Sequence, residues 1–391
     1  MINDPYKFPL NRFQSERQFE RIREFSKNKP TPFLIIDLDV IRQKYQELKT
    51  NLPMATIFYA LKANPMDEVV ALLHELGSHF DVASRHELDQ LLRLGVSPDL
   101  ISFGNTIKKK ADIAYFFERG VRLFVTDSSE DLANIATEAP GSRVFYRILT
   151  DGAGSDWPLS RKFGAHPDMI YHLIQEAKTL GIEPFGVSFH VGSQQRDIGQ
   201  WDEALARSKY LFDAAKELGL QLKMINIGGG FPANYMEQTN PIKVYTTEIL
   251  RFLSEDFKNN QPLIYMEPGR SIVGDAGIIV SEVIRVSAKT KNSFHRWVFL
   301  DIGKFGGLIE TMDESIQFPI FFDKEGKEEE IILAGPTCDS MDILYEKYKY
   351  TMPNNVTEGD RVYIFTTGAY TQSYCSINFN GFPPLKSYIL E

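Results

Sequence analysis

Short apolar segments alternate with helical patterns between residues 57 and 266 of this 391-residue chain, and no other feature constrains the fold as strongly. The segments, rich in β-branched and aromatic residues, are Ile57–Leu61, His79–Val82, Leu100–Phe103, Leu123–Val125, Val144–Ile148, Phe185–Phe189, Met224–Ile227 and Leu263–Met266. Patterns such as DEVVALLHELG lie between them, with apolar residues at the i, i+3, i+4 and i+7 spacing of amphipathic helices. Eight strand–helix repeats predict a (β/α)8 barrel, with a doubly wound open sheet as the alternative.

The rhythm changes near residue 276, after which strand-like segments follow one another with few helices between them. These segments are 277–289, Trp297–Leu300, Glu330–Leu333 and Arg361–Phe365. We therefore expect three parts: an N-terminal extension over 1–32, a barrel over 33–275 and a C-terminal β-rich domain over 276–391. The extended stretch Phe33–Leu38 is expected to pair with the β-rich domain.

Composition narrows the classes of protein that the chain can belong to. Hydrophobic residues make up 43% and charged residues 24%, which is typical of folded proteins. The net charge of −9 argues against a nucleic-acid partner, since such proteins carry a basic face. We expect no membrane span, because no apolar run reaches about 18 residues. Without an apolar signal segment, a cytoplasmic location is expected. Two cysteines and seven scattered histidines predict neither a disulfide framework nor a metal site.

Chemistry in a barrel of this kind gathers where the strands end at their carboxyl side. The strand ends here carry Lys62, Asp81, Arg147, His190, the triplet Gly228-Gly229-Gly230, and Glu267. A lysine that is partly desolvated after an apolar strand is a usable nucleophile, able to form a Schiff base with an aldehyde. A surface lysine just past a strand would give the same pattern, so Lys62 alone does not decide between the two.

Other strand-end residues suit the binding of a flat, phosphorylated ring. Three glycines let backbone N–H groups approach a phosphate, although a tight strand-to-helix turn would also require them. Glu267 can pair with a protonated pyridine nitrogen and Arg270 with a phosphate, or the two can form a buried structural pair. His190 can stack on a ring while Ser193 donates to a phosphate. A lone histidine in an apolar strand is, however, more often a core residue whose imidazole is hydrogen-bonded within the protein.

Eight motifs taken in order are far more specific than any of these residues alone. They are YALKANP, FDVAS, GVSFHVGS, INIGGGFP, MEPGRS, GPTCDS, TGAYT and FNGF. This set resembles the fold-type III decarboxylases, alanine-racemase-like enzymes that use pyridoxal 5'-phosphate to decarboxylate basic amino acids. The resemblance runs from about residue 30 to the end and is closest to bacterial ornithine and lysine/ornithine decarboxylases. It implies a barrel joined to a β-domain, and a homodimer with its two active sites at the interface.

The resemblance also assigns residues to the cofactor. It implies that Lys62 holds the cofactor covalently, that Glu267 faces the ring nitrogen and that His190 lies against the ring. The remaining cofactor-binding positions that it implies are Asp81, Glu87, Arg147, Ser193, Gly228, Gly229, Gly230, Gly269, Arg270 and Tyr370.

Residues of the β-rich domain are implied to complete the partner subunit's site. Cys338 is expected to donate the proton that replaces the carboxylate, and Asp339 to hold the distal amine of the substrate. Phe379 is expected near the departing carboxylate. A second acid that reads the substrate is either Asp313 or its neighbour Glu314, which a one-residue shift would exchange.

The expected reaction is decarboxylation of L-ornithine to putrescine. Decarboxylation of L-lysine to cadaverine is expected as a second reaction of the same enzyme. Lysine, arginine and diaminopimelate decarboxylases are alternatives, but the anionic Asp339 would repel the distal carboxylate of diaminopimelate. A racemase of the alanine racemase family is a further alternative, but that family has an arginine at the position of Glu267. A cofactor-binding regulatory protein without activity is the alternative outside enzymes, against which the presence of Lys62, Cys338 and Asp339 argues.

Overall fold

The structure, a computed structural model, describes residues 9–157, 162–258 and 260–390 of the chain. Its residues form two compact units. One unit comprises Arg42–Pro232 and Thr239–Ser271, and the other comprises Met1–Ile41, Ala233–Gln238 and Ile272–Glu391. In the described part of the chain, no helix is both long and apolar enough to cross a membrane.

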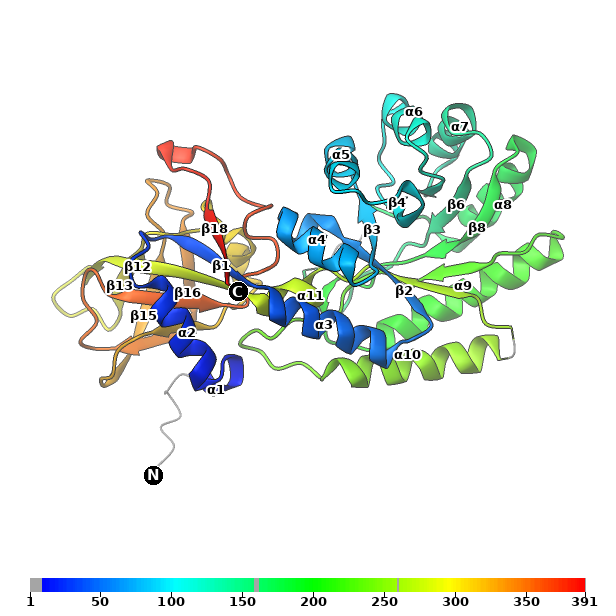
Figure 1. The fold of residues 1–391 in the computed structure, drawn as a ribbon. Coiled ribbons are helices and arrows are strands. Elements are labelled where there is room, and N and C mark those ends of the chain that lie inside the picture. Colours follow the sequence, from blue (N-terminus) through cyan, green and yellow to red (C-terminus); the bar gives the residue numbers. More distant parts are fainter. Residues whose placement is uncertain (1–8, 158–161, 259, 391) are drawn as a thin grey trace. The chain divides into compact units, whose positions relative to one another are not determined.

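The first unit is built on a closed barrel of parallel strands (Figure 1). Its strands are β2 (Ala55–Ala60), β3 (His79–Val82), β4 (Ile101–Phe103), β5 (Leu123–Thr126), β6 (Arg143–Arg147), β8 (Glu183–Ser188), β10 (Met224–Asn226) and β11 (Leu263–Met266). They follow one another around the barrel in chain order, and β11 pairs with β2 to close it. The predicted (β/α)8 barrel is therefore confirmed, and the open-sheet alternative is wrong.

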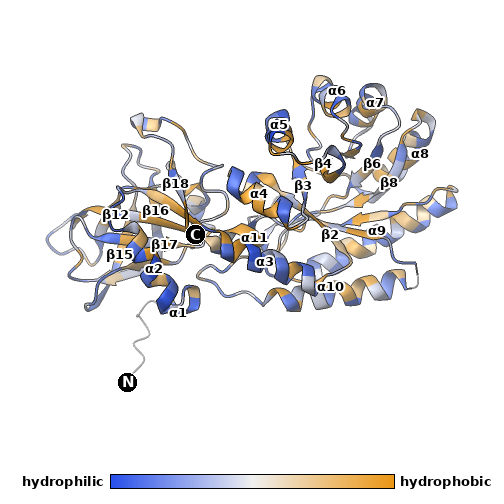
Figure 2. Cartoon of the chain, in the orientation of Figure 1, coloured by the Kyte–Doolittle hydropathy of each residue, from blue (hydrophilic) through white to orange (hydrophobic). Residues whose placement is uncertain are grey.

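Helices link successive barrel strands, as the sequence patterns predict. They are α4 (Asp67–Glu75), α5 (Arg85–Arg93), α6 (Lys110–Glu118), α7 (Ser129–Glu138), α8 (Pro167–Leu180), α9 (Gly199–Glu217) and α10 (Ile242–Phe257). A further helix, α3 (Leu38–Asn51), precedes the first barrel strand, β2. Most of these helices are amphipathic, and Figure 2 shows orange and blue segments alternating along the same helix ribbon. In α7, for example, Leu132 and Ile135 are buried, and the side chain of Ser128 caps the first turn by accepting from the N–H of Asp131.

The interior of the barrel is filled with side chains. One buried cluster takes residues from β2, β5, β6, β8 and β10, namely Phe58, Leu123, Val125, Phe145, Phe185 and Met224. A barrel packed in this way is a core and not a channel. Polar chemistry is consequently restricted to the strand ends and the loops that follow them.

The second unit is β-rich. Its strands are β1 (Phe33–Asp37), β12 (Gly277–Ser287), β13 (Arg296–Leu300), β14 (Ile320–Phe322), β15 (Glu328–Ala334), β16 (Ile343–Pro353), β17 (Arg361–Phe365) and β18 (Lys386–Leu390). The main path runs β14-β17-β12-β13-β15-β16, and β1 pairs with both β12 and β18. This sheet confirms the expected β-rich fold, although β14, β16 and β18 were not predicted.

Smaller elements complete the two units. In the β-rich unit, α1 (Leu10–Phe13) precedes α2 (Glu16–Ser26), whose Phe19 and Ile22 pack into the same core as Phe33 and Tyr363. In the barrel unit, β7 (Ser155–Trp157) pairs antiparallel with β9 (Ser193–Gln195). The short helix α11 spans Arg270–Val273.

Truncating a central strand side chain should destabilise the β-rich unit. Ile35 of β1 is 0% exposed and lies opposite Ile278 of β12 and Tyr388 of β18. Ile35→Ala should lower the free energy of unfolding by about 2–5 kcal/mol, because it leaves a cavity in a packed core. The matched control is Ile107→Ala, since Ile107 is 63% exposed and its loss should cost within about 0.5 kcal/mol. Urea midpoints measure both, and equal shifts would contradict this packing.

Candidate active site

Lys62 lies at the mouth of the barrel, where the short helix Leu61–Ala63 follows β2 directly. Its side chain is 49% exposed, and its Nζ is 3.8 Å from Oδ2 of Asp81, at the end of the neighbouring strand β3. Adjacent parallel strands end at the same edge of the barrel, and this brings the amine and the carboxylate together. The two predicted residues therefore share one site.

Asp81 is buried in a shell that fits it closely. Its side chain is 4% exposed, and Oδ1 accepts a hydrogen bond from Ser102 Oγ at 3.0 Å. A Cβ at position 104 would lie only 1.7 Å from that oxygen, so Gly104 has to be glycine. Burial, then the charge of Glu267, raises the pKa of Asp81 well above its ordinary value, while Lys62 opposes the rise. The surroundings of Asp81 therefore disfavour an additional negative charge.

His190 is held as a neutral ring with a defined tautomer. Its Nδ1 accepts a hydrogen bond from the backbone N–H of Gly192 at 3.1 Å, which places the ring proton on Nε2. Burial, followed by the positive charges of Arg147 and Lys62, lowers the pKa of His190 to about 3. A neutral, fixed imidazole is suited to lying against a flat ring.

Arg147 ends β6 and supplies a half-buried positive charge to the same group of strand-end residues. Burial lowers the pKa of this guanidinium, and the charges of Glu267 and Asp81 oppose the shift. An arginine stays charged in proteins in spite of such shifts. Arg147 therefore balances part of the negative charge of the two acids.

The glycine triplet forms a turn that tolerates no side chain. A Cβ on Gly228 would lie 2.1 Å from the carbonyl oxygen of Phe189, and one on Gly230 would lie 2.6 Å from that of Gly192. Gly228 and Gly230 also have φ values of +67° and +94°, in the region that favours glycine. Within the described residues, the N–H groups of Gly229 and Gly230 have no protein acceptor. Such donors fit an external anion such as a phosphate.

Arg270 adds a buried cation suited to the same anion. It is the first residue of α11, and its Nε donates to Oγ of Ser193 at 3.0 Å. Both residues are buried, as is Gly269 just before them. A buried guanidinium and a hydroxyl are common phosphate ligands.

Glu267 follows β11 and is tied to the glycine turn. Its backbone N–H donates to the carbonyl oxygen of Gly228 at 2.8 Å, and its Oε1 accepts from Nδ2 of Asn226 at 2.5 Å. Asn226 was not among the predicted site residues. It is the polar last residue of an apolar strand immediately before Ile227 and the glycines, and that position is the signal that could have found it.

Glu87 is engaged at the start of α5. Its Oε2 accepts from the backbone N–H of Ala83 at 2.6 Å, and its own N–H donates to Ser84 Oγ at 3.3 Å. Burial raises the pKa of Glu87, and the Ala83 hydrogen bond and the charge of Lys62 oppose the rise. These two hydrogen bonds are those of a residue that caps the N-terminus of α5.

Six predicted site residues belong to the β-rich unit: Asp313, Glu314, Cys338, Asp339, Tyr370 and Phe379. Cys338 and Asp339 are exposed on the GPTCDS turn, and Cys338 donates its N–H to Oδ1 of Asn380 at 3.0 Å. Buried Asp342, which was not predicted, organises this turn by accepting from N and Oγ1 of Thr337 at 3.1 and 2.7 Å. Asp342 therefore stabilises the turn through hydrogen bonds, and Cys338 and Asp339 remain exposed to solvent.

The two neighbouring acids differ sharply in their surroundings. The carboxylate of Glu314 accepts three backbone N–H groups of β16, from Glu346, Lys347 and Tyr348, at 2.6–2.8 Å. Burial would raise the pKa of Glu314, but these three donors outweigh it and lower the pKa. Asp313 is exposed. Asp313 is therefore the acid that has a carboxylate available for a ligand.

A cavity of about 220 Å³ in the β-rich unit is lined by one of these six residues, Phe379, and by Pro336 and Thr337 of the GPTCDS turn. Phe305, Thr337, Phe379 and Phe382 are among its lining residues. The Phe305 and Phe379 rings contact each other, with centroids 4.7 Å apart. Phe379 is thereby held in an apolar wall next to the turn that carries Cys338.

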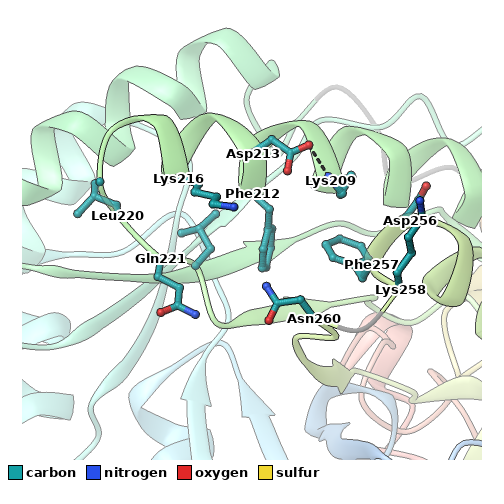
Figure 3. A pocket seen from close by; sticks show the side chains of 12 residues that line it. Lys209, Phe212, Asp213, Lys216, Leu220, Gln221, Asp256, Phe257, Lys258 and Asn260 are labelled. Carbon is teal, nitrogen blue, oxygen red and sulfur yellow. Dashed lines mark hydrogen bonds and ion pairs between the residues drawn. The ribbon is translucent and has the colours of Figure 1, made fainter.

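A larger cavity of about 600 Å³ belongs to the barrel unit and is lined by residues of α9 and α10 and of the segments after them (Figure 3). Phe212 and Phe257 meet edge to face there, and Lys209 pairs with Asp213. None of the predicted site residues lines this cavity. It lies apart from the chemistry described above.

The state of His190 can be tested directly. A pKa of about 3 and an acceptor role for Nδ1 predict a neutral ring protonated on Nε2 from pH 5 to pH 8. Nitrogen-15 NMR of histidine-labelled protein should show one resonance pair with this tautomer and no shift across that range. The urea-unfolded protein is the control, since its histidines titrate near 6.5. A His190 signal that moves with a midpoint above pH 5 would refute this description.

Comparison with known proteins agrees with this geometry. Residues 38–274 match the pyridoxal binding domain of the pyridoxal-dependent decarboxylases. The chain is 33% identical to the lysine/ornithine decarboxylase of Selenomonas ruminantium over 95% of this chain and 93% of that protein. It is 32% identical to antizyme inhibitor 2 of Xenopus laevis, over 90% of this chain and 79% of that protein.

A solved structure gives the same result. The lysine/ornithine decarboxylase of Vibrio vulnificus, in complex with putrescine, superposes with a TM-score of 0.87 at 32% identity. The match covers 96% of this chain and 99% of the Vibrio chain. With a barrel, a β-rich unit and a family match over more than half of its length, this chain belongs to the pyridoxal-dependent decarboxylase family.

Proposed function

We propose that this chain decarboxylates L-ornithine to putrescine and L-lysine to cadaverine, with pyridoxal phosphate as its cofactor. The observation that carries the proposal is the set of strand ends in the barrel unit. They combine an accessible lysine amine, Lys62, with a carboxylate at Glu267 and a buried cation at Arg270. These are the three groups that an aldehyde, a ring nitrogen and a phosphate on one cofactor require.

The residues fit this cofactor in detail. The Nζ of Lys62 would hold it covalently, and the carboxylate of Glu267 would hold a proton on the ring nitrogen. The N–H groups of Gly229 and Gly230, which meet no acceptor in the described part of the chain, would bind the phosphate together with Arg270. Bound pyridoxal phosphate supplies an electron sink for the electron pair that is left when a carboxylate departs as CO2.

Neutral His190 supports this chemistry without adding charge. A protonated imidazole against the ring would place a second positive charge there. That charge would disfavour the proton that Glu267 is proposed to hold on the ring nitrogen. The pKa of about 3 keeps the imidazole neutral, and the Gly192 N–H fixes its orientation. Stacking and positioning are therefore the roles we propose for His190.

The β-rich unit supports a substrate with a distal ammonium group. Asp339 and Asp313 are exposed carboxylates, whereas Glu314 is occupied by backbone N–H groups. We propose that Asp339 and Asp313 bind the distal amine. The thiol of Cys338 would return a proton to the α-carbon, and Phe379 would favour loss of the charged carboxylate by excluding water.

A second copy of the chain is proposed to bring these residues to the barrel site. Exposed large apolar side chains gather in the same stretches of the β-rich unit, namely Met341, Tyr374, Ile377 and Phe382. Apolar side chains concentrated in this way are typical of surfaces that are covered by a partner. Each active site would then combine Lys62 of one subunit with Cys338 and Asp339 of the other, and Tyr370 would join the phosphate ligands.

A regulatory protein without activity is the second candidate, favoured by the similarity to antizyme inhibitor 2. The presence of Lys62, Glu267 and Cys338 in the sequence supports the enzyme over this candidate. Turnover decides between them. The cytoplasmic location expected from the sequence stays a prediction.

Loss of the lysine amine should abolish turnover. The purified protein with added pyridoxal phosphate should release CO2 from ornithine and lysine, and far less from diaminopimelate. Lys62→Ala should lower the rate of CO2 release by at least about a hundredfold, because covalent attachment through the amine is lost. Lys209→Ala is the matched control and should keep full activity, since Lys209 pairs with Asp213 away from the site. A wild-type protein that binds cofactor but turns over none of these amino acids would support the regulatory candidate.

Mixed dimers test the shared site. Lys62→Ala and Asp339→Ala proteins should each be nearly inactive alone. After subunit exchange, about half of the dimers should be mixed, and each mixed dimer should contain one intact site. Recovered activity should approach roughly a quarter of the wild-type value under this symmetric arrangement. If native mass spectrometry shows exchange but activity does not return, Lys62 and Asp339 act within one chain.

A further inference from the structure

Asn226 closes a ring of hydrogen bonds between the glycine turn and Glu267. The Glu267 N–H donates to Gly228 O at 2.8 Å, and the Gly228 N–H donates to Asn226 Oδ1 at 2.9 Å. Asn226 Nδ2 then donates back to Glu267 Oε1 at 2.5 Å. Asn226 is 2% exposed, so water does not compete for these bonds.

The ring of hydrogen bonds allows only one orientation of the Asn226 amide. A backbone N–H can only donate, so the atom of Asn226 that faces Gly228 must be the oxygen. The other end of the amide is therefore an N–H donor, and it points at Glu267. In this way Asn226 fixes one oxygen of Glu267 and leaves Oε2 with no hydrogen bond from the described residues.

The chemical type of this residue also matters. Glu267 already interacts with Asp81, whose pKa is raised by burial and by the charge of Glu267. An amide stabilises the Glu267 anion by donating to it and adds no charge. A carboxylate at position 226 would place a third acid beside these two.

We propose that Asn226 is a positioning residue that holds Glu267 as an oriented anion, with Oε2 available for the ring nitrogen of the cofactor. The inference rests on the proposed function, because it gives Glu267 a ring nitrogen to face. It also couples two parts of the site: the turn proposed to bind the phosphate and the acid proposed to bind the ring are joined through one side chain.

A double-mutant cycle tests this role in the holoenzyme. Asn226→Leu should lower the single-turnover rate on the order of tenfold or more, the effect of losing a hydrogen bond to a charged group. The Michaelis constant for ornithine should stay within about threefold. In a Glu267→Ala background, Asn226→Leu should cost less than about threefold further, since no carboxylate remains to be oriented. Equal losses in both backgrounds would mean that Asn226 only stabilises the fold.

A swapped pair separates orientation from charge, with the dissociation constant of pyridoxal phosphate as a readout independent of turnover. Asn226→Asp should weaken cofactor binding, and more so as the pH rises from 6 to 8.5, because two facing carboxylates must share a proton. Adding Glu267→Gln restores a donor–acceptor pair with its direction reversed. The double variant should regain cofactor affinity to within a few fold while its rate stays low.

The outcomes of these experiments are distinguishable. A wild-type protein that neither binds pyridoxal phosphate nor releases CO2 would overturn the proposed function itself. A wild-type enzyme that does both, together with additive effects in the cycle and no recovery of affinity in the swapped pair, would overturn only the role of Asn226.

Discussion

Closure of the parallel barrel is the constraint on which the rest of this structure depends. Once β11 pairs with β2, the strand ends meet at one rim, and the packed interior keeps polar groups out of the barrel itself. Lysine, arginine, histidine and two acids are consequently gathered at this rim, where their exposure ranges from 4% for the Asp81 side chain to 49% for that of Lys62. Their charges then shift one another, as the raised pKa of Asp81 and the lowered pKa of His190 show.

The balance of charge among these strand-end residues accounts for which of them are charged and which are neutral. Lys62 and Arg147 offset Asp81 and Glu267, and His190 stays neutral. Hydrogen bonding is done by groups that add no charge, namely Ser102 to Asp81 and Asn226 to Glu267. An arrangement of this kind can orient the carboxylate of Glu267 although a second acid, Asp81, lies close enough to interact with it.

The sequence predicted the barrel well because strands covered on both faces read as continuous apolar runs. It missed β16, whose segment ILYEKYKYTMP mixes buried tyrosines with exposed charges, and β14, which has only three residues. The choice between Asp313 and Glu314 could not be made from spacing. It depends on which carboxylate meets the backbone of β16, and the chain brings that strand alongside only after folding. Asn226 was missed for a similar reason, because a single asparagine at a strand end forms no pattern.

The central claim is that the amine of Lys62 carries the cofactor, and borohydride reduction followed by peptide mapping tests it most directly. The holoenzyme is reduced, digested and examined by mass spectrometry. We expect a pyridoxyl phosphate group on the peptide that contains Lys62 and on no other lysine peptide. The group on a different lysine, or no covalent cofactor in a protein that is saturated with pyridoxal phosphate, would contradict the assignment of this site.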